Sequence, residues 1–274
     1  MEKTSENKDR FASRAFYVHV AGNRLRVKMI EPQDFLGEKC GATLVFLHEG
    51  LGCIELWRDF PEVLCSATGC RGLVYERKGY GDSDVLSGPW TADYLIEEAT
   101  VDLPGVLAAC DIDDAVLIGH SDGGTIALIA SATNGDAVRG IITEAAHIFV
   151  EDITLEGIRK AVEAFATTRL KEKLARYHKD RTETVFRRWA ERWLSDEFRS
   201  WNINAYLPRI TCPALIIQGE DDEYGTSAQL EGIARGVSGP VAAKLIPDCG
   251  HIPHFQARDT VLKEMAQFVR GVTA

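Results

Sequence analysis

Ser121 lies between two glycines in a stretch whose residue types could activate a hydroxyl group. The apolar run Val116 to Ile118 leads into Gly119-His120-Ser121-Asp122-Gly123, and a helix-forming run from Thr125 to Ala130 follows. This order predicts a strand, a tight turn and a helix with Ser121 at the apex. A Cβ on either glycine would clash with the closely approaching chain. The turn would hold the serine oxygen at the carboxyl edge of a sheet, beside unpaired N–H groups that favour a developing negative charge.

Two later strand ends carry the residue types that such a serine would need. A serine hydroxyl is a weak nucleophile near neutral pH, so it requires a base, and that base requires a carboxylate to fix its tautomer. Acidic residues 220–223 follow the apolar run 214–218, and His251 follows the apolar run 242–246. Active groups gather where parallel strands end, so we expect an acid and His251 to meet Ser121. The chain order serine, acid, histidine is one known solution to this chemistry.

The elements that must position these residues alternate between strand and helix. Strands are predicted at residues 16–20, 25–29, 42–47, 72–75, 115–118, 138–143, 214–218 and 242–246. Helices are predicted at residues 57–67, 92–110, 126–132, 227–237 and 261–269. The first two strands form a hairpin, and the later alternation predicts an α/β fold with a mainly parallel sheet and helices on both of its faces.

A charged segment interrupts this alternation. Residues 158–207 contain neither glycine nor proline, so we expect them to be helical. We interpret residues 151–207 as a helical cap over the carboxyl edge, inserted into one core domain of residues 1–150 and 208–274. Trp189 and Trp193 have helical spacing in this segment. Each could face the site or only pack the cap onto the core, as buried aromatic residues commonly do.

Composition limits the partners. The chain has 274 residues, of which 45% are hydrophobic and 26% charged, and its net charge is −10. These fractions are typical of a soluble globular protein, and the negative charge argues against a nucleic acid or an anionic membrane as partner. A small-molecule partner is favoured by elimination. A homo-oligomer is allowed, but nothing in the sequence points to one.

The seven cysteines are odd in number and form no Cys-x-x-Cys pair. We therefore expect buried thiols in a reducing compartment and no metal cluster. The first residues lack the apolar core of a signal peptide, and no run of about 18 apolar residues occurs. Together these observations predict a cytoplasmic protein.

Over nearly its whole length the sequence resembles the α/β-hydrolase family. Besides the serine turn, the matching features are the loop His48 to Gly52, the Arg77-Lys78-Gly79-Tyr80-Gly81-Asp82-Ser83 segment, the Gly219-x-x-Asp222 turn and Gly250-His251. The resemblance implies an eight-stranded α/β-hydrolase sheet with a helical cap. The sequence departs from its relatives at Glu49 and Lys78, where they commonly have glycine.

By this resemblance Ser121 is the nucleophile, His251 is the general base and then the general acid, and Asp222 is the orienting carboxylate. Asp221 is the main alternative to Asp222, and Glu144 is a more remote one. The resemblance implies no metal and no organic cofactor.

The resemblance also implies an oxyanion hole, in which two backbone N–H groups stabilise the charge on the substrate carbonyl oxygen. Asp122 supplies one of them. Gly50 is favoured for the other, although Glu49 leaves the register open between Gly50 and Leu51. A carboxylate near that oxygen opposes catalysis, so we expect the side chains of Glu49 and Asp122 to turn into other hydrogen bonds.

Four residues are predicted to contact substrate: Glu49, Leu51, Trp189 and His254. For Glu49 the alternative to a structural role is contact with a polar or cationic part of the substrate. His254 either lines the site or caps the last helix. His48 and His120 are expected to be structural residues whose rings bond to backbone.

The sequence therefore predicts a serine hydrolase that cleaves a small carboxylic ester or lactone through an acyl-enzyme. One alternative is a hydrolase of a C–C bond in a vinylogous diketone acid. That enzyme would need a basic pocket, for which the cap offers Arg181, Arg187, Arg188 and Arg192. A ligand-binding protein without turnover is the remaining alternative.

Overall fold

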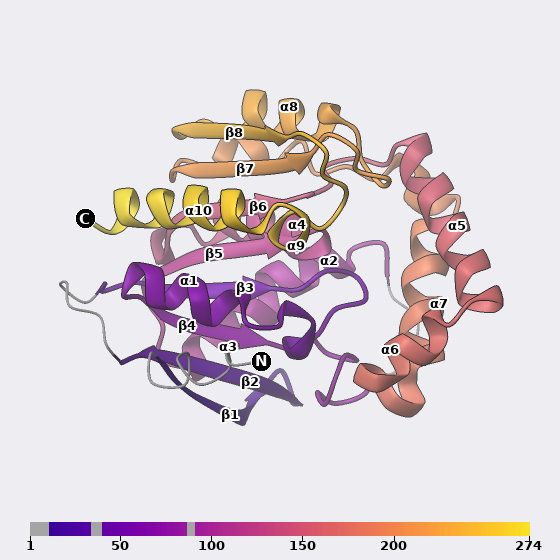
Figure 1. Cartoon of the computed structure of the whole chain (residues 1–274), viewed down its shortest axis with the longest axis horizontal. Coiled ribbons are helices and arrows are strands. Elements are labelled where there is room, and N and C mark those ends of the chain that lie inside the picture. Colours follow the sequence, from indigo (N-terminus) through magenta and orange to yellow (C-terminus); the bar gives the residue numbers. More distant parts are fainter. Residues whose placement is uncertain (1–10, 34–39, 87–90) are drawn as a thin grey trace, which may run out of the picture.

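A single eight-stranded sheet organises the chain (Figure 1). The computed structural model describes residues 11–33, 40–86 and 91–274. The strands are β1 (Phe11–Val20), β2 (Asn23–Pro32), β3 (Thr43–Leu47), β4 (Arg71–Tyr75), β5 (Ala115–His120), β6 (Val138–Glu144), β7 (Ala214–Gly219) and β8 (Val241–Ile246). Their order is β1-β2-β4-β3-β5-β6-β7-β8. The predicted eight-stranded, mainly parallel sheet is confirmed.

The first two strands are the antiparallel part of the sheet. Strand β1 pairs with β2 around a two-residue turn at Ala21 and Gly22, both with positive φ. Strand β2 also runs antiparallel to β4, whereas the pairs from β4 to β8 are all parallel. Every residue of β3 and β5 is buried, as expected for strands covered on both faces.

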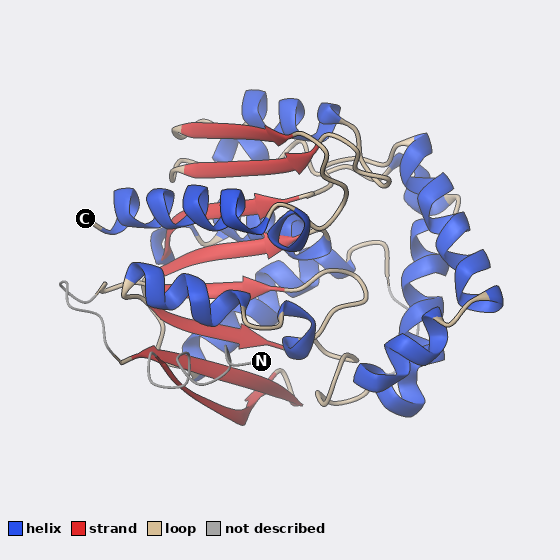
Figure 2. Cartoon of the chain, in the orientation of Figure 1, coloured by secondary structure: helices blue, strands red, loops and turns tan. Residues whose placement is uncertain are grey.

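Helices cover both faces of the sheet (Figure 2). The helices are α1 (Phe60–Thr68), α2 (Tyr94–Glu97), α3 (Leu103–Ala109), α4 (Asp122–Thr133), α5 (Asp152–Thr167), α6 (Leu170–His178), α7 (Thr182–Trp193), α8 (Ser227–Gly236), α9 (Pro253–Gln256) and α10 (Arg258–Thr273). Helices α1 and α10 bury their apolar residues against one face. Helices α3, α4 and α8 do so against the other face.

Two predicted helices differ in detail from the structure. The helix predicted from residue 92 to 110 consists of α2 and α3 joined by a π-helical turn at Glu98–Asp102. The helix predicted from residue 57 begins later, because Ile54–Trp57 is a short 3-10 turn and Pro61 occupies the first turn of α1. Proline is compatible with a helix only in its first turn, which sets this start.

Helices α5, α6 and α7 lie between β6 and β7 in the chain and stand off the carboxyl ends of the strands (Figure 1). The prediction of helix throughout 158–207 is confirmed for α5, α6 and α7, as far as Trp193, and is wrong after it. Helix α5 starts earlier, at a capping box made by Glu151 and Thr154. After Trp193 the chain leaves the α-helix, because Ser195 Oγ accepts from the N–H of Phe198 and Asn202 Oδ1 accepts from the N–H of Asn204.

The cysteine prediction needs one correction. Cys40 and Cys70 form a disulfide, whereas we expected only reduced thiols. Cys53, Cys65 and Cys249 are buried free thiols, as predicted for the apolar segments. Among the described residues, no helix has the length and apolar character required to cross a membrane.

Candidate active site

The serine turn joins β5 directly to α4. Ser121 has φ 53° and ψ −117°, a conformation that non-glycine residues rarely adopt. A Cβ on Gly119 would overlap the carbonyl of Gly123, and a Cβ on Gly123 would overlap the carbonyl of Leu47 at the end of β3. Both glycines are therefore required by close backbone approach, which was the physical reason for expecting the turn.

The structure brings Ser121, Asp222 and His251 together from the ends of three strands. His251 Nε2 lies 3.0 Å from Ser121 Oγ, and His251 Nδ1 lies 2.8 Å from Asp222 Oδ1. Asp222 is buried and Asp221 is exposed, so the competing acid faces away. Glu144 contacts a different histidine, His254, at 2.8 Å. Of the acids considered, only Asp222 touches the imidazole of His251.

The surroundings of Asp222 keep it ionised. Burial alone would raise its pKa, but the charge of His251 and hydrogen bonds from His251 and the Tyr224 N–H outweigh burial and hold the pKa below its usual range. Gln218 also donates to the second carboxylate oxygen. An ionised Asp222 accepts the Nδ1 proton of His251, which leaves Nε2 as a lone-pair acceptor facing the Ser121 hydroxyl.

Three backbone N–H groups beside Ser121 are the candidate donors to a substrate carbonyl oxygen. Those of Gly50, Leu51 and Asp122 have no hydrogen-bond acceptor among the residues that the structure describes. Gly50 is held from its carbonyl side, where the Tyr80 hydroxyl donates at 2.9 Å, and His178 Nε2 donates to the Leu51 carbonyl at 2.9 Å. The oxyanion hole, with Asp122 and either Gly50 or Leu51 as its donors, stays a prediction.

The two nearby carboxylates are engaged with other groups, as expected. Asp122 is 1% exposed, and its Oδ2 accepts from the Tyr94 hydroxyl at 3.0 Å and lies 3.4 Å from Arg77 Nη2. Glu49 Oε2 lies 3.7 Å from His120 Nδ1. His120 Nε2 in turn contacts the His251 carbonyl at 2.7 Å, so the ring bonds to backbone as predicted.

The pair of Glu49 and His120 has opposite pKa shifts. Burial alone would raise the pKa of Glu49, but the contact with His120 lowers it to about 2. Burial alone would lower the pKa of His120, but Glu49 raises it above its usual value. Glu49 therefore contributes to stability above about pH 4.5, and this contribution is lost as the pH falls toward 2. His120 contributes to stability below about pH 6.5, and this contribution is lost as the pH rises through its raised pKa.

We expect Glu49→Gln to weaken the fold near pH 6 and to reduce the fall in stability between pH 6 and pH 8. The first effect should be roughly 1–3 kcal/mol, because a buried imidazole loses its charged partner. Urea unfolding at both pH values checks it, with Glu220→Gln on the exposed surface as control. A variant whose stability still falls as steeply as that of the unmodified chain would exclude the charged pair.

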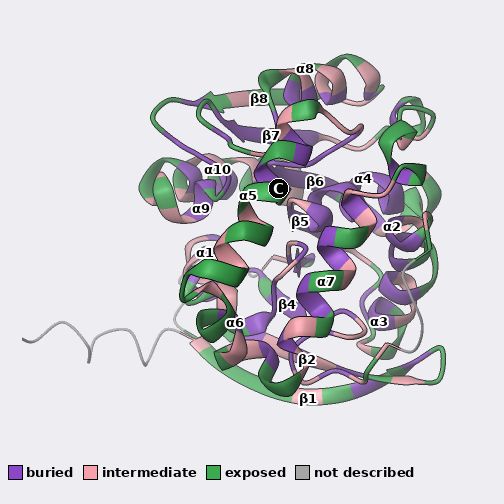
Figure 3. Ribbon diagram, turned by 90° about the vertical axis from the view of Figure 1, so that its right-hand side faces the viewer, coloured by how far each residue is buried: buried purple, intermediate pink, exposed green. Residues whose placement is uncertain are grey.

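Ser121 lines a cavity of about 270 Å³ together with residues of helices α5, α6 and α7. Figure 3 views the molecule from the side on which these three helices lie. The apolar lining of the cavity comprises Leu51, Leu56, Ile158, Leu174, Trp189, Trp193, Tyr224 and Ile252. The polar lining includes Glu49, His147 and Glu223. A larger hollow of about 640 Å³ lies near the residues that precede β5 and β6, and it contains none of the predicted site residues.

The predicted contact residues Glu49, Leu51 and Trp189 line the cavity, but His254 does not. The expectation that His254 contacts substrate is therefore corrected. Its ring is buried against Trp57 and Phe60, and its Nδ1 is held by Glu144 at 2.8 Å. The first turn of the short helix α9 carries it behind the site.

Sequence reasoning missed His147 and Tyr224. His147 Nε2 donates to the Tyr224 carbonyl at 3.0 Å, and the His147 ring lies 5.9 Å from that of His251. Burial lowers the pKa of His147, which keeps it neutral. Both residues follow strands that end at the same edge of the sheet, so the strand-end rule applied to β6 and β7 could have found them.

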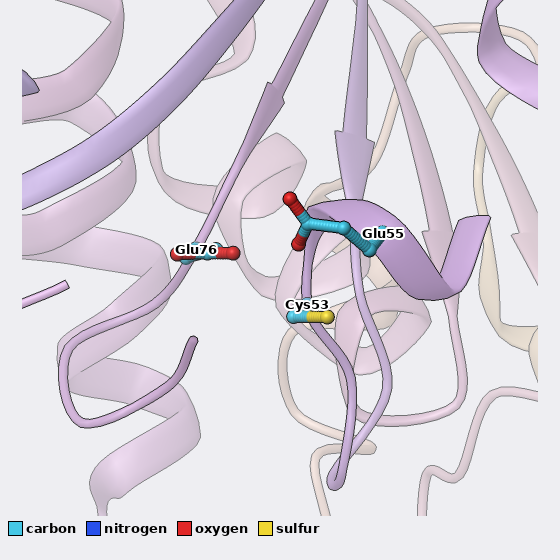
Figure 4. Close-up of side chains that lie close together, drawn as sticks. All are labelled: Cys53, Glu55 and Glu76. Carbon is cyan, nitrogen blue, oxygen red and sulfur yellow. The ribbon is translucent and has the colours of Figure 1, made fainter. Parts of the chain in front are cut away.

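Among the described residues, Cys53, Glu55 and Glu76 are grouped closely enough to hold a metal ion (Figure 4). The Arg26 guanidinium already lies 2.6 Å from Glu55 and 3.1 Å from Glu76. Burial raises the pKa of Glu76 to about 7, and burial also keeps Cys53 in its thiol form by raising its pKa. An arginine in place and a protonated thiol do not fit a cation site.

Comparisons with known proteins agree with this architecture. A sequence model of the alpha/beta hydrolase family matches residues 44–264. The human serine hydrolase BPHL is 30% identical over 208 residues, which cover 72% of this chain and 69% of that protein.

Solved structures show the same fold at low identity. The enol-lactonase of Burkholderia xenovorans is 22% identical with a TM-score of 0.70, and the match covers 93% of this chain and 99% of that one. The esterase of Thermogutta terrifontis is 19% identical with a TM-score of 0.69, covering 95% and 100%. With the sheet, the serine turn and the family match in agreement, the chain belongs to the α/β-hydrolase family and is a hydrolase.

Proposed function

We propose that this hydrolase uses Ser121 as its nucleophile and cleaves a small carboxylic ester or lactone through an acyl-enzyme. The single observation that carries this proposal is the continuous contact from Ser121 Oγ to His251 Nε2 at 3.0 Å and from His251 Nδ1 to Asp222 at 2.8 Å. Such a chain of contacts can remove the serine proton as its oxygen attacks.

The reaction would proceed in two halves. Ser121 Oγ bonds to the substrate carbonyl carbon while His251 takes the serine proton, and the carbonyl oxygen becomes an anion between the N–H groups of Asp122 and Gly50 or Leu51. His251 then gives its proton to the leaving oxygen, and the C–O bond breaks. Water deprotonated by His251 attacks the acyl-enzyme, and the acid product leaves with Ser121 restored.

The cavity supports a small, largely apolar substrate. Its volume of about 270 Å³ is at the lower end for ligand pockets, and most of its lining is hydrophobic. Two proteins that share this fold are named as an esterase and an enol-lactonase, and these names refer to the cleavage of esters and lactones. We extend this substrate class to the present chain as part of the proposal.

The cavity lining argues against the C–C hydrolase alternative, because that substrate carries carboxylates. None of the described lining residues is Lys or Arg. Arg181 and Arg188 donate to backbone carbonyls of Ser83 and Leu86, while Arg187 and Arg192 pair with Glu183 and Glu197. The four cap arginines are thus engaged elsewhere, and a neutral ester remains the better candidate.

A fluorophosphonate probe tests the proposal and also the alternative of a protein without turnover. We expect stoichiometric covalent labelling of Ser121, located by peptide mass spectrometry. Labelling should be much slower in Asp222→Asn, because the imidazole loses its tautomer control, and unchanged in Asp221→Asn. A folded chain that stays unlabelled would contradict a nucleophilic Ser121.

We propose the cytoplasm as the location, because the seven cysteines are odd in number and no run of about 18 apolar residues occurs. The disulfide between Cys40 and Cys70 weighs against it, since disulfides are rare in reducing compartments. Counting the alkylated thiols in protein extracted rapidly from its own cells tests this location. Seven alkylated cysteines would favour the cytoplasm, and five would favour a compartment in which Cys40 and Cys70 stay oxidised.

A further inference from the structure

The Arg77 guanidinium is buried directly behind the proposed oxyanion hole. Arg77 follows β4 at the carboxyl edge of the sheet and is 1% exposed. Its Nη2 donates to the Glu49 carbonyl at 2.8 Å and lies 3.4 Å from Asp122 Oδ2. It therefore contacts the residue before one favoured N–H donor and the side chain of the residue that supplies the other.

The contact with Glu49 acts on the Gly50 donor through a single peptide group. The Glu49 carbonyl and the Gly50 N–H are the two ends of one planar, conjugated unit. Fixing the oxygen fixes the direction of the N–H. Hydrogen bonds accepted by that oxygen also draw electron density toward it, which makes the N–H a stronger donor.

His48 supplies a second bond to the same carbonyl, and its tautomer follows from its contacts. The Arg77 N–H donates to His48 Nε2 at 3.1 Å, so the proton is on Nδ1, which donates to the Glu49 carbonyl at 2.8 Å. Burial lowers the pKa of His48 to about 3, so the ring stays neutral. Arg77 thus holds the carbonyl directly with its side chain and indirectly through its own backbone.

The contact with Asp122 compensates a charge beside the second donor. A bare carboxylate here would oppose the developing oxyanion. The Tyr94 hydroxyl donates to Asp122 Oδ2 at 3.0 Å, and the cap residue Trp193 donates to Tyr94 at 3.1 Å. Both contacts are made by Oδ2, which has the positive charge of Arg77 next to it, while Oδ1 is buried with no hydrogen-bond partner among the described residues.

We propose that Arg77 is a positioning residue that orients and polarises the Gly50 donor and neutralises Asp122, so that one buried cation serves both halves of the oxyanion hole. This inference rests on the proposed ester hydrolysis. It assigns Gly50, rather than Leu51, as the donor from the loop, because the charged Arg77 contacts the carbonyl of the Glu49–Gly50 peptide, whereas the carbonyl of the Gly50–Leu51 peptide accepts from the neutral Tyr80 hydroxyl.

An alkyl trifluoromethyl ketone separates this role from a merely structural one. Ser121 adds to its carbonyl carbon, His251 takes the serine proton, and the carbonyl oxygen becomes a stable alkoxide in the oxyanion hole. The variants are Arg77→Gln, Arg77→Lys and Tyr94→Phe. The control is Tyr75→Phe, because the hydroxyl of Tyr75 is buried in β4 with no partner among the described residues.

In Arg77→Gln we expect kcat for p-nitrophenyl acetate to fall roughly 10²-fold, with KM nearly unchanged and inhibitor affinity reduced by a similar factor. Arg77→Lys keeps the charge but loses the fork geometry, so it should retain more activity than Arg77→Gln. In Tyr94→Phe both kcat and inhibitor affinity should fall about tenfold. Tyr75→Phe should match the unmodified chain.

Inhibitor affinity that stays unchanged in a folded Arg77→Gln chain would overturn the inference. If that variant does not fold, Tyr94→Phe decides, since unchanged affinity there would equally overturn it. Absence of ester turnover in the unmodified chain would instead remove the proposed function, so the two failures are told apart.

Discussion

Replacing Ser121 with alanine is expected to lower kcat for ester hydrolysis by roughly 10⁴-fold or more, because the acyl-enzyme can no longer form. His251 then has no hydroxyl to deprotonate, while the N–H groups and the cavity remain. Residual turnover by directly attacking water should therefore persist above the uncatalysed rate. Steady-state kinetics with p-nitrophenyl acetate measure the fall in kcat and the residual turnover, and fluorophosphonate labelling checks that the nucleophile is lost.

The matched control is Ser131→Ala. Ser131 lies later in the same helix, α4, and its hydroxyl donates to the Ala127 carbonyl at 2.8 Å. It contacts no residue of the site, so its removal should leave kcat unchanged. A Ser121→Ala chain that is folded and still turns over at the original rate would show that another group performs the chemistry.

The serine turn could be predicted because its requirement is local. Two glycines flank a serine between an apolar run and a helix-forming run, and the structure shows the backbone contacts that exclude any Cβ at Gly119 and Gly123. His251 and an acid within residues 220–223 followed from strand ends, since parallel strands bring their carboxyl ends to one edge whatever lies between them. The choice of Asp222 among those acids came from the resemblance to the α/β-hydrolase family.

The residues whose surroundings were not predicted, His254 and Arg77, make their contacts with residues that are far away in the sequence. His254 is three residues from His251, but the turn into α9 carries it to Glu144 and Trp57, which are far away in sequence. Arg77 was recognised as part of a family segment, yet its contacts with Glu49 and Asp122 require β3, β4 and β5 to be adjacent. No pattern within one segment carries such information.

Replacing Gly123 with alanine is expected to prevent stable folding. The new Cβ would overlap the Leu47 carbonyl, which belongs to β3 in the centre of the sheet and cannot move without breaking the pairing of β3 with β5. Overpacking against fixed backbone exceeds the usual cost of a point mutation, so we expect a loss greater than about 4 kcal/mol. Urea unfolding followed by tryptophan fluorescence measures it.

Gly271→Ala is the matched control, because a Cβ there meets nothing within 4 Å and the residue lies in helix α10. Alanine favours a helix over glycine by up to about 1 kcal/mol, so this chain should be unchanged or slightly more stable. The contrast isolates steric overlap from any general effect of removing a glycine. A Gly123→Ala chain as stable as its Gly271→Ala counterpart would mean that β5 and α4 do not approach β3 as closely as this turn requires.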